Sequence, residues 1–133
     1  MRTFKFVPTM FAALSLSAMA SSVSWAATET VFTQTAFTTA QHEGKPILVD
    51  ISATWCPTCA AQKPILSQLF SEPANKDLVV YHVDFDSQKD VVRAMGARMQ
   101  STLIVFHGGA EKGRSTGDTD ATSIKALVSK ANQ

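Results

Sequence analysis

Hydrophobic positions along the chain alternate between continuous runs and helical stripes. Three continuous apolar runs have the length of buried β-strands. They are residues 47–51, 78–85 and 102–106. Residues 57–70 and 88–97 instead carry apolar side chains at helical spacing and predict two helices. Gly108-Gly109 follows the third run and indicates a hairpin that returns as a strand over 110–115.

The two ends of this region extend the same alternation. Val31 and Phe32 form a short apolar group, and a polar stretch with Phe37 and Ala40 follows as a candidate helix. Asp120 is a suitable N-cap for a last helix that carries further apolar residues. The element order β-α-β-α-β-α-β-β-α predicts an α/β fold, in which a mixed central sheet has helices on both faces.

The first residues follow a different pattern. Arg2 and Lys5 give a short positive start, and residues 7–20 carry no charge. Ser24 and Ala26 are small residues at −3 and −1 of a plausible cleavage point. This three-part arrangement is typical of a secretory signal peptide.

We therefore expect a signal peptide over residues 1–26 and a single domain over 27–133, located in the periplasm or secreted. Cleavage after Ala20 is an alternative. An uncleaved anchor is a second alternative, although the apolar run is shorter than the roughly 20 residues that span a bilayer.

Charge and composition are those of an ordinary globular domain, with 45% hydrophobic and 17% charged residues. Loss of residues 1–26 would leave ten basic and eleven acidic residues. No basic patch or nucleic-acid signature is present, so we expect no nucleic-acid partner. No heptad or additional apolar face suggests self-association, and we expect a monomer.

Cys56 and Cys59 are the two cysteines of the chain, and Pro57-Thr58 separates them. A disulfide across so small a loop constrains the unfolded chain by only about 2 kcal/mol, against about 3 for a 15-residue loop. The pair is therefore better explained by chemistry than by stability. Pro57 suits a first helical turn, which places Cys56 at the helix N-terminus, where backbone N–H groups stabilise a thiolate.

This placement predicts thiol–disulfide exchange. Cys56 attacks a partner's disulfide, and Cys59, expected to lie further inside, resolves the mixed disulfide. A zinc site is less consistent with the sequence, which has no second CxxC and no histidine pair at ligand spacing. Covalent haem attachment needs a histidine after Cys59, and Ala60 stands there.

Several features around the cysteines resemble the thioredoxin family over residues 30–131. They are Trp55 before the motif, Asp50 six residues before Cys56, Pro64 eight residues after it, the strand 102–106 with its Gly-Gly turn, and Gly117. The resemblance implies a thioredoxin fold and a thiol–disulfide oxidoreductase acting on protein thiols and disulfides without a cofactor.

The resemblance also implies roles for individual residues. Asp50 would transfer protons to and from Cys59 through water, although a satisfied polar residue at a strand end is the simpler alternative. The implied substrate-binding residues are Trp55, Pro57, Thr58, Ser101 and Gly117. Because Pro57-Thr58 lacks the histidine of strong oxidants, we expect a reductase, recharged by a membrane electron donor.

Two positions depart from the family pattern. Ser101 stands where the family has a cis-proline, so a trans loop is expected there. Its hydroxyl could bind a cysteine sulfur, change the binding of substrate, or leave room for copper or an iron–sulfur cluster, which gives a metal carrier as the alternative function. Ser101 could equally be a tolerated substitution with none of these effects. His82 replaces a buried lysine; it either tunes Asp50 or, as we favour, is a half-exposed strand residue. Met95 and Met99 are expected to pack at the core or helix edge.

Overall fold

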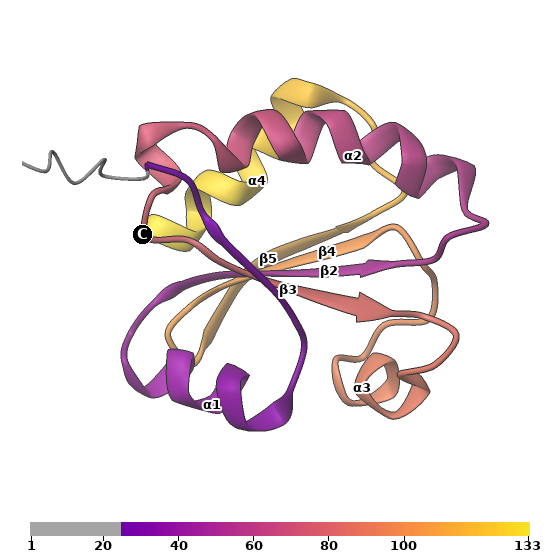
Figure 1. The fold of residues 1–133 in the computed structure, drawn as a ribbon, viewed down its shortest axis with the longest axis horizontal. Helices are drawn as coiled ribbons and strands as arrows, with labels where there is room; N and C mark the ends of the chain where they lie inside the picture. Colours follow the sequence, from indigo (N-terminus) through magenta and orange to yellow (C-terminus); the bar gives the residue numbers. More distant parts are fainter. Residues whose placement is uncertain (1–24) are drawn as a thin grey trace, which may run out of the picture.

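The computed structural model describes residues 25–133, in which five strands form one sheet in the order β1-β3-β2-β4-β5 (Figure 1). The strands are β1 (Thr28–Val31), β2 (Pro46–Ser52), β3 (Val79–Asp84), β4 (Thr102–His107) and β5 (Ala110–Thr116). Strand β3 runs parallel to β1 and β2, whereas β4 is antiparallel to β2 and β5. The expected signal peptide lies outside the described residues apart from its last two positions.

Four helices cover the sheet, two on each face. They are α1 (Gln34–His42), α2 (Pro57–Phe70), α3 (Lys89–Ala94) and α4 (Ala121–Ser129). Helices α2 and α4 lie on one face and α1 and α3 on the other, as Figure 1 shows. The mixed sheet with helices on both faces confirms the fold class expected from the sequence. In the described part of the chain, no helix is long and apolar enough to cross a membrane.

Strand β2 divides the core into two clusters because successive side chains point to opposite faces of the sheet. Ile47, Val49 and Ile51 pack into the cluster that includes residues of α1 and α3. Leu48 packs into the cluster formed with α2 and α4. Asp50 follows Leu48 by two positions, so its carboxylate lies on the same face as this second cluster, under α2.

Two expectations at the edges of elements need correction. Helix α3 ends at Ala94, short of the predicted 97, because Met95 caps it and Gly96 takes a left-handed φ of +66° that stops a helix. Val31, expected in an apolar group, is 67% exposed because β1 is the sheet edge and has a neighbouring strand on one side only.

Candidate active site

The two cysteines lie where β2 gives way to α2, and they form a disulfide. Cys56 is the N-cap of α2, and its sulfur accepts a hydrogen bond from the backbone N–H of Cys59 at 3.1 Å. Their Cα atoms are 5.3 Å apart, which is within the usual range for a disulfide. Pro57 occupies the first turn of the helix, as expected, where its missing N–H costs no intrahelical hydrogen bond. The local sequence therefore places Cys56 where a negative sulfur is stabilised.

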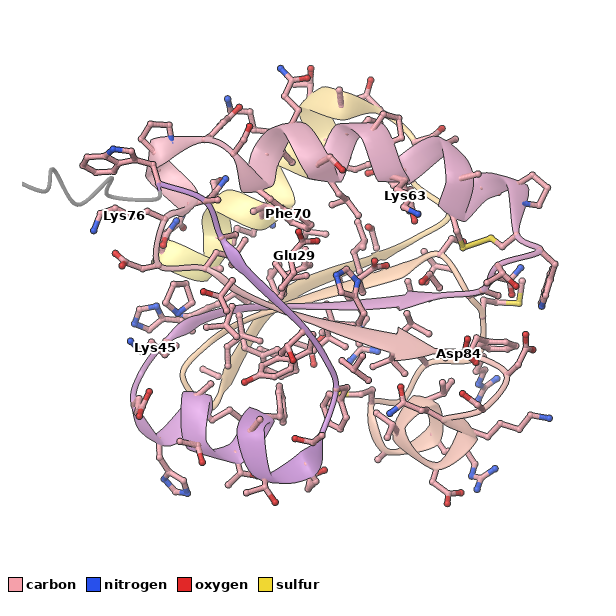
Figure 2. All side chains as sticks on the ribbon, viewed as in Figure 1. Glu29, Lys45, Lys63, Phe70, Lys76 and Asp84 are labelled. Atoms are coloured by element: carbon pink, nitrogen blue, oxygen red, sulfur yellow. A yellow bond between two sulfur atoms is a disulfide. The ribbon has the colours of Figure 1, made fainter. Side chains whose placement is uncertain are left out.

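The exposure of the two cysteines differs from the expectation that Cys59 lies further inside. Cys56 is 2% exposed and Cys59 is 9% exposed, so both are buried and Cys56 slightly more so. Both side chains pack with Ala53 and line the cavity beneath α2, and their disulfide is the yellow bond at the start of α2 in Figure 2. The two cysteines therefore differ in their place at the helix N-terminus rather than in exposure, and the assignment of Cys56 as the attacking group stays a prediction.

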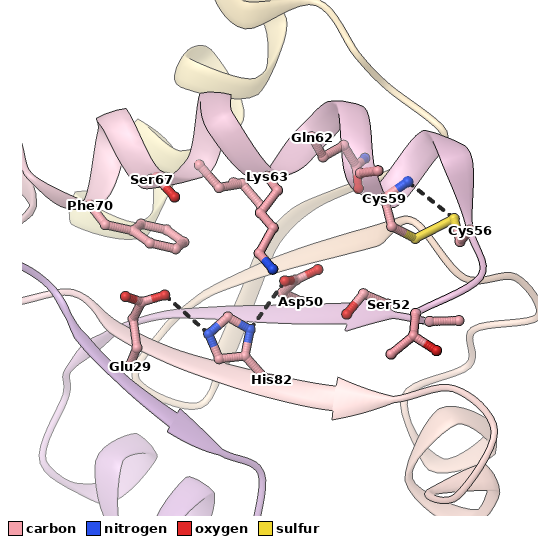
Figure 3. Close-up of a pocket in the computed structure, with 14 residues that line it drawn as sticks. Glu29, Asp50, Ser52, Cys56, Cys59, Gln62, Lys63, Ser67, Phe70 and His82 are labelled. Carbon is pink, nitrogen blue, oxygen red and sulfur yellow. Dashed lines mark hydrogen bonds and ion pairs between the residues drawn. A yellow bond between two sulfur atoms is a disulfide. The ribbon is translucent and has the colours of Figure 1, made fainter.

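Beneath α2 lies a cavity of about 430 Å³ that reaches both cysteines (Figure 3). Its wall is formed by α2 on one side and by β1, β2 and β3 on the other. The ionisable and polar side chains that matter for its chemistry are Glu29, Asp50, Cys59, Gln62, Lys63 and His82. The Asp50 carboxylate and the Cys59 sulfur thus share one partly enclosed space.

Asp50 is 8% exposed, and its interaction with His82 offsets the free-energy cost of burying its carboxylate. His82 Nδ1 lies 3.2 Å from Asp50 Oδ2, and His82 Nε2 lies 3.1 Å from Glu29 Oε1. In Figure 3 the imidazole stands between the two carboxylates, and the Lys63 side chain points from α2 toward Asp50. The His82 side chain is 38% exposed, which agrees with the prediction of a half-exposed strand residue. It also contacts Asp50 directly.

The hydrogen bond to Asp50 raises the pKa of His82 above its ordinary value of 6.5. Burial acts in the opposite direction, while the charges of Asp50 and Glu29 add to the increase. The imidazolium form is favoured because it can donate from both ring nitrogens to the two carboxylates.

This shift predicts a pH dependence of stability. A raised folded-state pKa gives a contribution that is complete below about pH 6.5 and is lost as pH rises through the folded pKa. The free energy of unfolding should therefore exceed that of His82→Gln most clearly below pH 6.5, with the difference shrinking toward alkaline pH. Urea unfolding at a series of pH values measures it. A His82→Gln difference that grows with pH would contradict the assignment.

Ser101 lies in a trans loop, as expected, since no cis peptide bond occurs among residues 25–133. Its φ is +55°, a left-handed conformation that is unusual for a residue with a side chain. The hydroxyl donates to the carbonyl of Gln100 at 2.6 Å rather than to a cysteine sulfur. The Ser101 carbonyl accepts from the backbone N–H of Gly117 at 2.9 Å and from Gln62 Nε2 at 3.3 Å. These contacts hold the loop in its conformation.

Gln62 was missed by the sequence reasoning. It is 1% exposed, and its Nε2 also donates to the carbonyl of Asp118 at 2.8 Å. Gln62 therefore ties α2 to the loop before β4 and to the loop after β5. It precedes Leu66 by four positions and Leu69 by seven, so a polar residue on the buried stripe of the helix was the available signal.

Trp55 is 58% exposed beside the cysteines, as expected for a docking residue. Its indole Nε1 donates to Asp86 Oδ2 at 2.7 Å, which fixes the ring orientation. Pro57 and Gly117 are exposed and Thr58 is half-buried, and their contacts with substrate remain predictions.

The two methionines after α3 differ. Met95 packs against the core, as expected. Met99 is 52% exposed, so the packing expected for it is wrong, because Met99 lies in a loop after α3 has ended.

Comparison with known proteins gives consistent results. The family model described as Thioredoxin matches residues 28–130. A thioredoxin of Mycobacterium bovis is 37% identical over 73 residues, which are 55% of this chain and 62% of that protein, slightly under two thirds of its length. An H-type thioredoxin of Chlamydomonas reinhardtii is 33% identical over 90 residues, covering 68% of this chain and 78% of that protein. The crystal structure of Trxlp from Edwardsiella tarda is 40% identical with a TM-score of 0.73, covering 76% of this chain and 97% of that one.

Proposed function

This chain belongs to the thioredoxin family, and from that premise we propose that it is a thiol–disulfide oxidoreductase that exchanges disulfides with protein partners. The observation that carries the proposal is the disulfide between Cys56 and Cys59 at the start of α2, with the Cys56 sulfur accepting a backbone N–H. A thiolate formed at that position is stabilised by the same donor and by the helix dipole.

The reaction proceeds in two exchange steps. The Cys56 thiolate attacks one sulfur of the partner's disulfide, a new S–S bond forms, and the other partner sulfur leaves with the electron pair. Cys59 then loses its proton and attacks the Cys56 sulfur, which releases the second partner sulfur as a thiolate. The partner gains two electrons, and the Cys56–Cys59 disulfide is restored. Asp50 shares the cavity with Cys59 and receives its proton.

We propose the reducing direction. Neither Pro57 nor Thr58 carries an ionisable side chain that would further stabilise the reduced thiolate. The test is insulin reduction driven by dithiothreitol, followed by equilibration with glutathione to obtain the potential. We expect turnover of insulin and a potential well below that of strong oxidants; a value near about −120 mV would reverse the direction.

We further propose that the protein is exported and works in the periplasm or outside the cell. The support is the charged start, apolar stretch and small-residue cleavage pattern of residues 1–26. Because such compartments are oxidising, a reductase there needs an electron donor on the membrane. Mass analysis of the protein produced in its host should give a chain that begins at residue 27; an intact Met1 would contradict cleavage.

Trp55 should contribute to the binding of protein partners. Replacing it with alanine removes an exposed, oriented aromatic surface beside Cys56 and should raise KM for insulin about 5- to 30-fold, as the loss of an interface anchor worth about 1–2 kcal/mol does. The rate with the small disulfide 5,5′-dithiobis(2-nitrobenzoate) should change less than twofold. Equal losses with both substrates would place Trp55 in the chemistry instead.

The alternative of a copper or iron–sulfur carrier gains no comparable support. Within residues 25–133, no group of three or more histidine, cysteine or acidic side chains is arranged to hold a metal ion. Metal analysis of protein purified under reducing conditions would test this alternative: stoichiometric metal that is lost in Cys59→Ser would favour it.

A further inference from the structure

We propose that Glu29 and His82 form a proton-transfer path between solvent and Asp50, and that His82 is a positioning residue for the step in which Cys59 resolves the mixed disulfide. The inference rests on the proposed function and deepens it, since it concerns how the proton from Cys59 leaves the buried site.

The geometry of the three side chains supports a path. His82 uses both ring nitrogens, with Nδ1 3.2 Å from Asp50 and Nε2 3.1 Å from Glu29. An imidazole held in this way can accept a proton on one nitrogen and release one from the other. Figure 3 shows the ring standing between the two carboxylates, with Asp50 on the side of the cysteines.

The three side chains also become steadily more exposed along this line. The exposed fraction is 11% for the Asp50 side chain, 38% for His82 and 50% for Glu29. The buried carboxylate that shares the cavity with Cys59 is therefore connected, through one imidazole, to a carboxylate in contact with solvent.

The sheet register holds the path in place. Asp50 pairs with His82 across β2 and β3, and Glu29 pairs with Val80, two positions before His82. Because alternate residues of a strand share a face, all three side chains lie on the α2 face of the sheet. Three adjacent strands thus present the groups without any loop that would have to close.

The other groups around His82 set its charge. Glu29 faces it from β1 and Asp50 from β2, and both favour the imidazolium. From α2, Lys63 points into the same region, and its positive charge opposes protonation of His82 (Figure 3). An imidazole that touches a carboxylate at each ring nitrogen can accept a proton on one side and release one on the other.

The cavity supplies the remaining link between Cys59 and Asp50. Gln62 lines it, and the buried Oε1 of this residue has no hydrogen-bond partner among the described residues. A cavity of about 430 Å³ lined by Asp50, Cys59 and Gln62 has the room and the polar residues that water needs. Proton transfer from Cys59 to Asp50 through such water requires no movement of α2.

The proton balance of the resolving step follows. The S–H bond of Cys59 breaks, its sulfur forms the S–S bond with Cys56, and the partner's sulfur leaves with the electron pair. The proton passes to Asp50 and then to His82 Nδ1, which gives the imidazolium. His82 Nε2 releases a proton toward Glu29 and solvent, so Asp50 is a carboxylate again and His82 keeps its proton on Nδ1. When the Cys56–Cys59 disulfide is next reduced, Cys59 takes up a proton along the same path in reverse, and His82 regains the Nε2 proton.

The test follows the two thiol releases when the reduced protein is mixed rapidly with 5,5′-dithiobis(2-nitrobenzoate) between pH 5.5 and 9. The first release depends on reagent concentration and reports attack by Cys56. The second is unimolecular and reports resolution by Cys59. We expect the unimolecular rate to rise with pH through a step above pH 6.5 that follows the titration of His82.

Two variants and one control define the result. In His82→Gln the pH-dependent rise of the unimolecular rate should disappear, and the rate at pH 8 should fall about tenfold. This loss is smaller than the loss of a whole general base, because Asp50 remains. In Glu29→Gln the step should remain but move to lower pH, since a neighbouring carboxylate no longer favours the imidazolium. His42→Gln, an exposed histidine on α1, should retain the profile of the unaltered protein.

The outcomes separate this inference from the proposed function. If the concentration-dependent release is absent, the oxidoreductase function itself fails. If that release is normal while His82→Gln keeps both the step and the rate, the proton path is overturned and His82 only stabilises the fold. Glu29 is half exposed and its replacement leaves the core intact, so an unmoved step in Glu29→Gln overturns the path even if His82→Gln folds poorly.

Discussion

Insulin reduction should fall to the rate of dithiothreitol alone when Cys56 is replaced by serine. The serine hydroxyl is not ionised near neutral pH, whereas a thiolate at the N-cap of α2 is stabilised by the backbone N–H of Cys59. Without the attacking sulfur no mixed disulfide forms, so the loss should be complete rather than partial. A turbidity assay of insulin with equal amounts of each protein measures it.

The matched variant is Cys59→Ser, which keeps the attacker and removes the resolving sulfur. It should also lose turnover, but it should retain the first step and accumulate as a mixed disulfide, seen as a mass increase that dithiothreitol reverses. Cys56→Ser should show no such adduct. If the two variants exchanged these behaviours, Cys59 would be the attacker, a result that the similar burial of the two cysteines makes worth testing.

The same Cys59→Ser variant gives access to physiological partners. Proteins trapped on Cys56 in the host compartment should be released by dithiothreitol and should be absent from a Cys56→Ser control. Their identity would also decide whether the protein reduces or oxidises its partners, since trapped intermediates of a reductase come from disulfide-bearing substrates.

Much of the fold could be predicted from local patterns. The runs at 47–51 and 102–106 are long, continuous and rich in branched residues, and they became β2 and β4 with nearly the expected bounds. The N-caps at Cys56 and Asp120 were also correct, because capping depends on a few neighbouring residues: the Asp120 carboxylate accepts the backbone N–H of Ser123.

The candidate active site could be predicted only in the parts that depend on residues close together in the sequence. The contact of His82 with Asp50 and Glu29 depends on the register of three strands far apart in the chain, which no local pattern specifies. The role of Gln62 depends in the same way on two distant carbonyls, those of Ser101 and Asp118. The burial of Cys56 likewise results from tertiary packing, so its helix position was predictable and its exposure was not.

Replacing Asp50 with asparagine should slow the resolving step about 100-fold, at the low end of what a positioned general base contributes. Asparagine has nearly the same shape but cannot accept the proton of Cys59 at neutral pH. Attack by Cys56 should be unchanged, because the helix N-terminus stabilises that thiolate independently of the carboxylate. The mixed disulfide should therefore accumulate transiently in Asp50→Asn, although both cysteines are present.

Rapid mixing with 5,5′-dithiobis(2-nitrobenzoate) separates the two steps, and acid quenching followed by mass analysis detects the intermediate. Asp77→Asn is the matched control, since its side chain is 69% exposed and pairs with Lys76 on the surface; it should resolve at the normal rate. A resolving rate in Asp50→Asn within twofold of the control would reduce Asp50 to a satisfied polar residue at a strand end. A slowed first step would instead mean that the carboxylate acts on Cys56, and the assignment of Asp50 to the resolving step of Cys59 would be wrong.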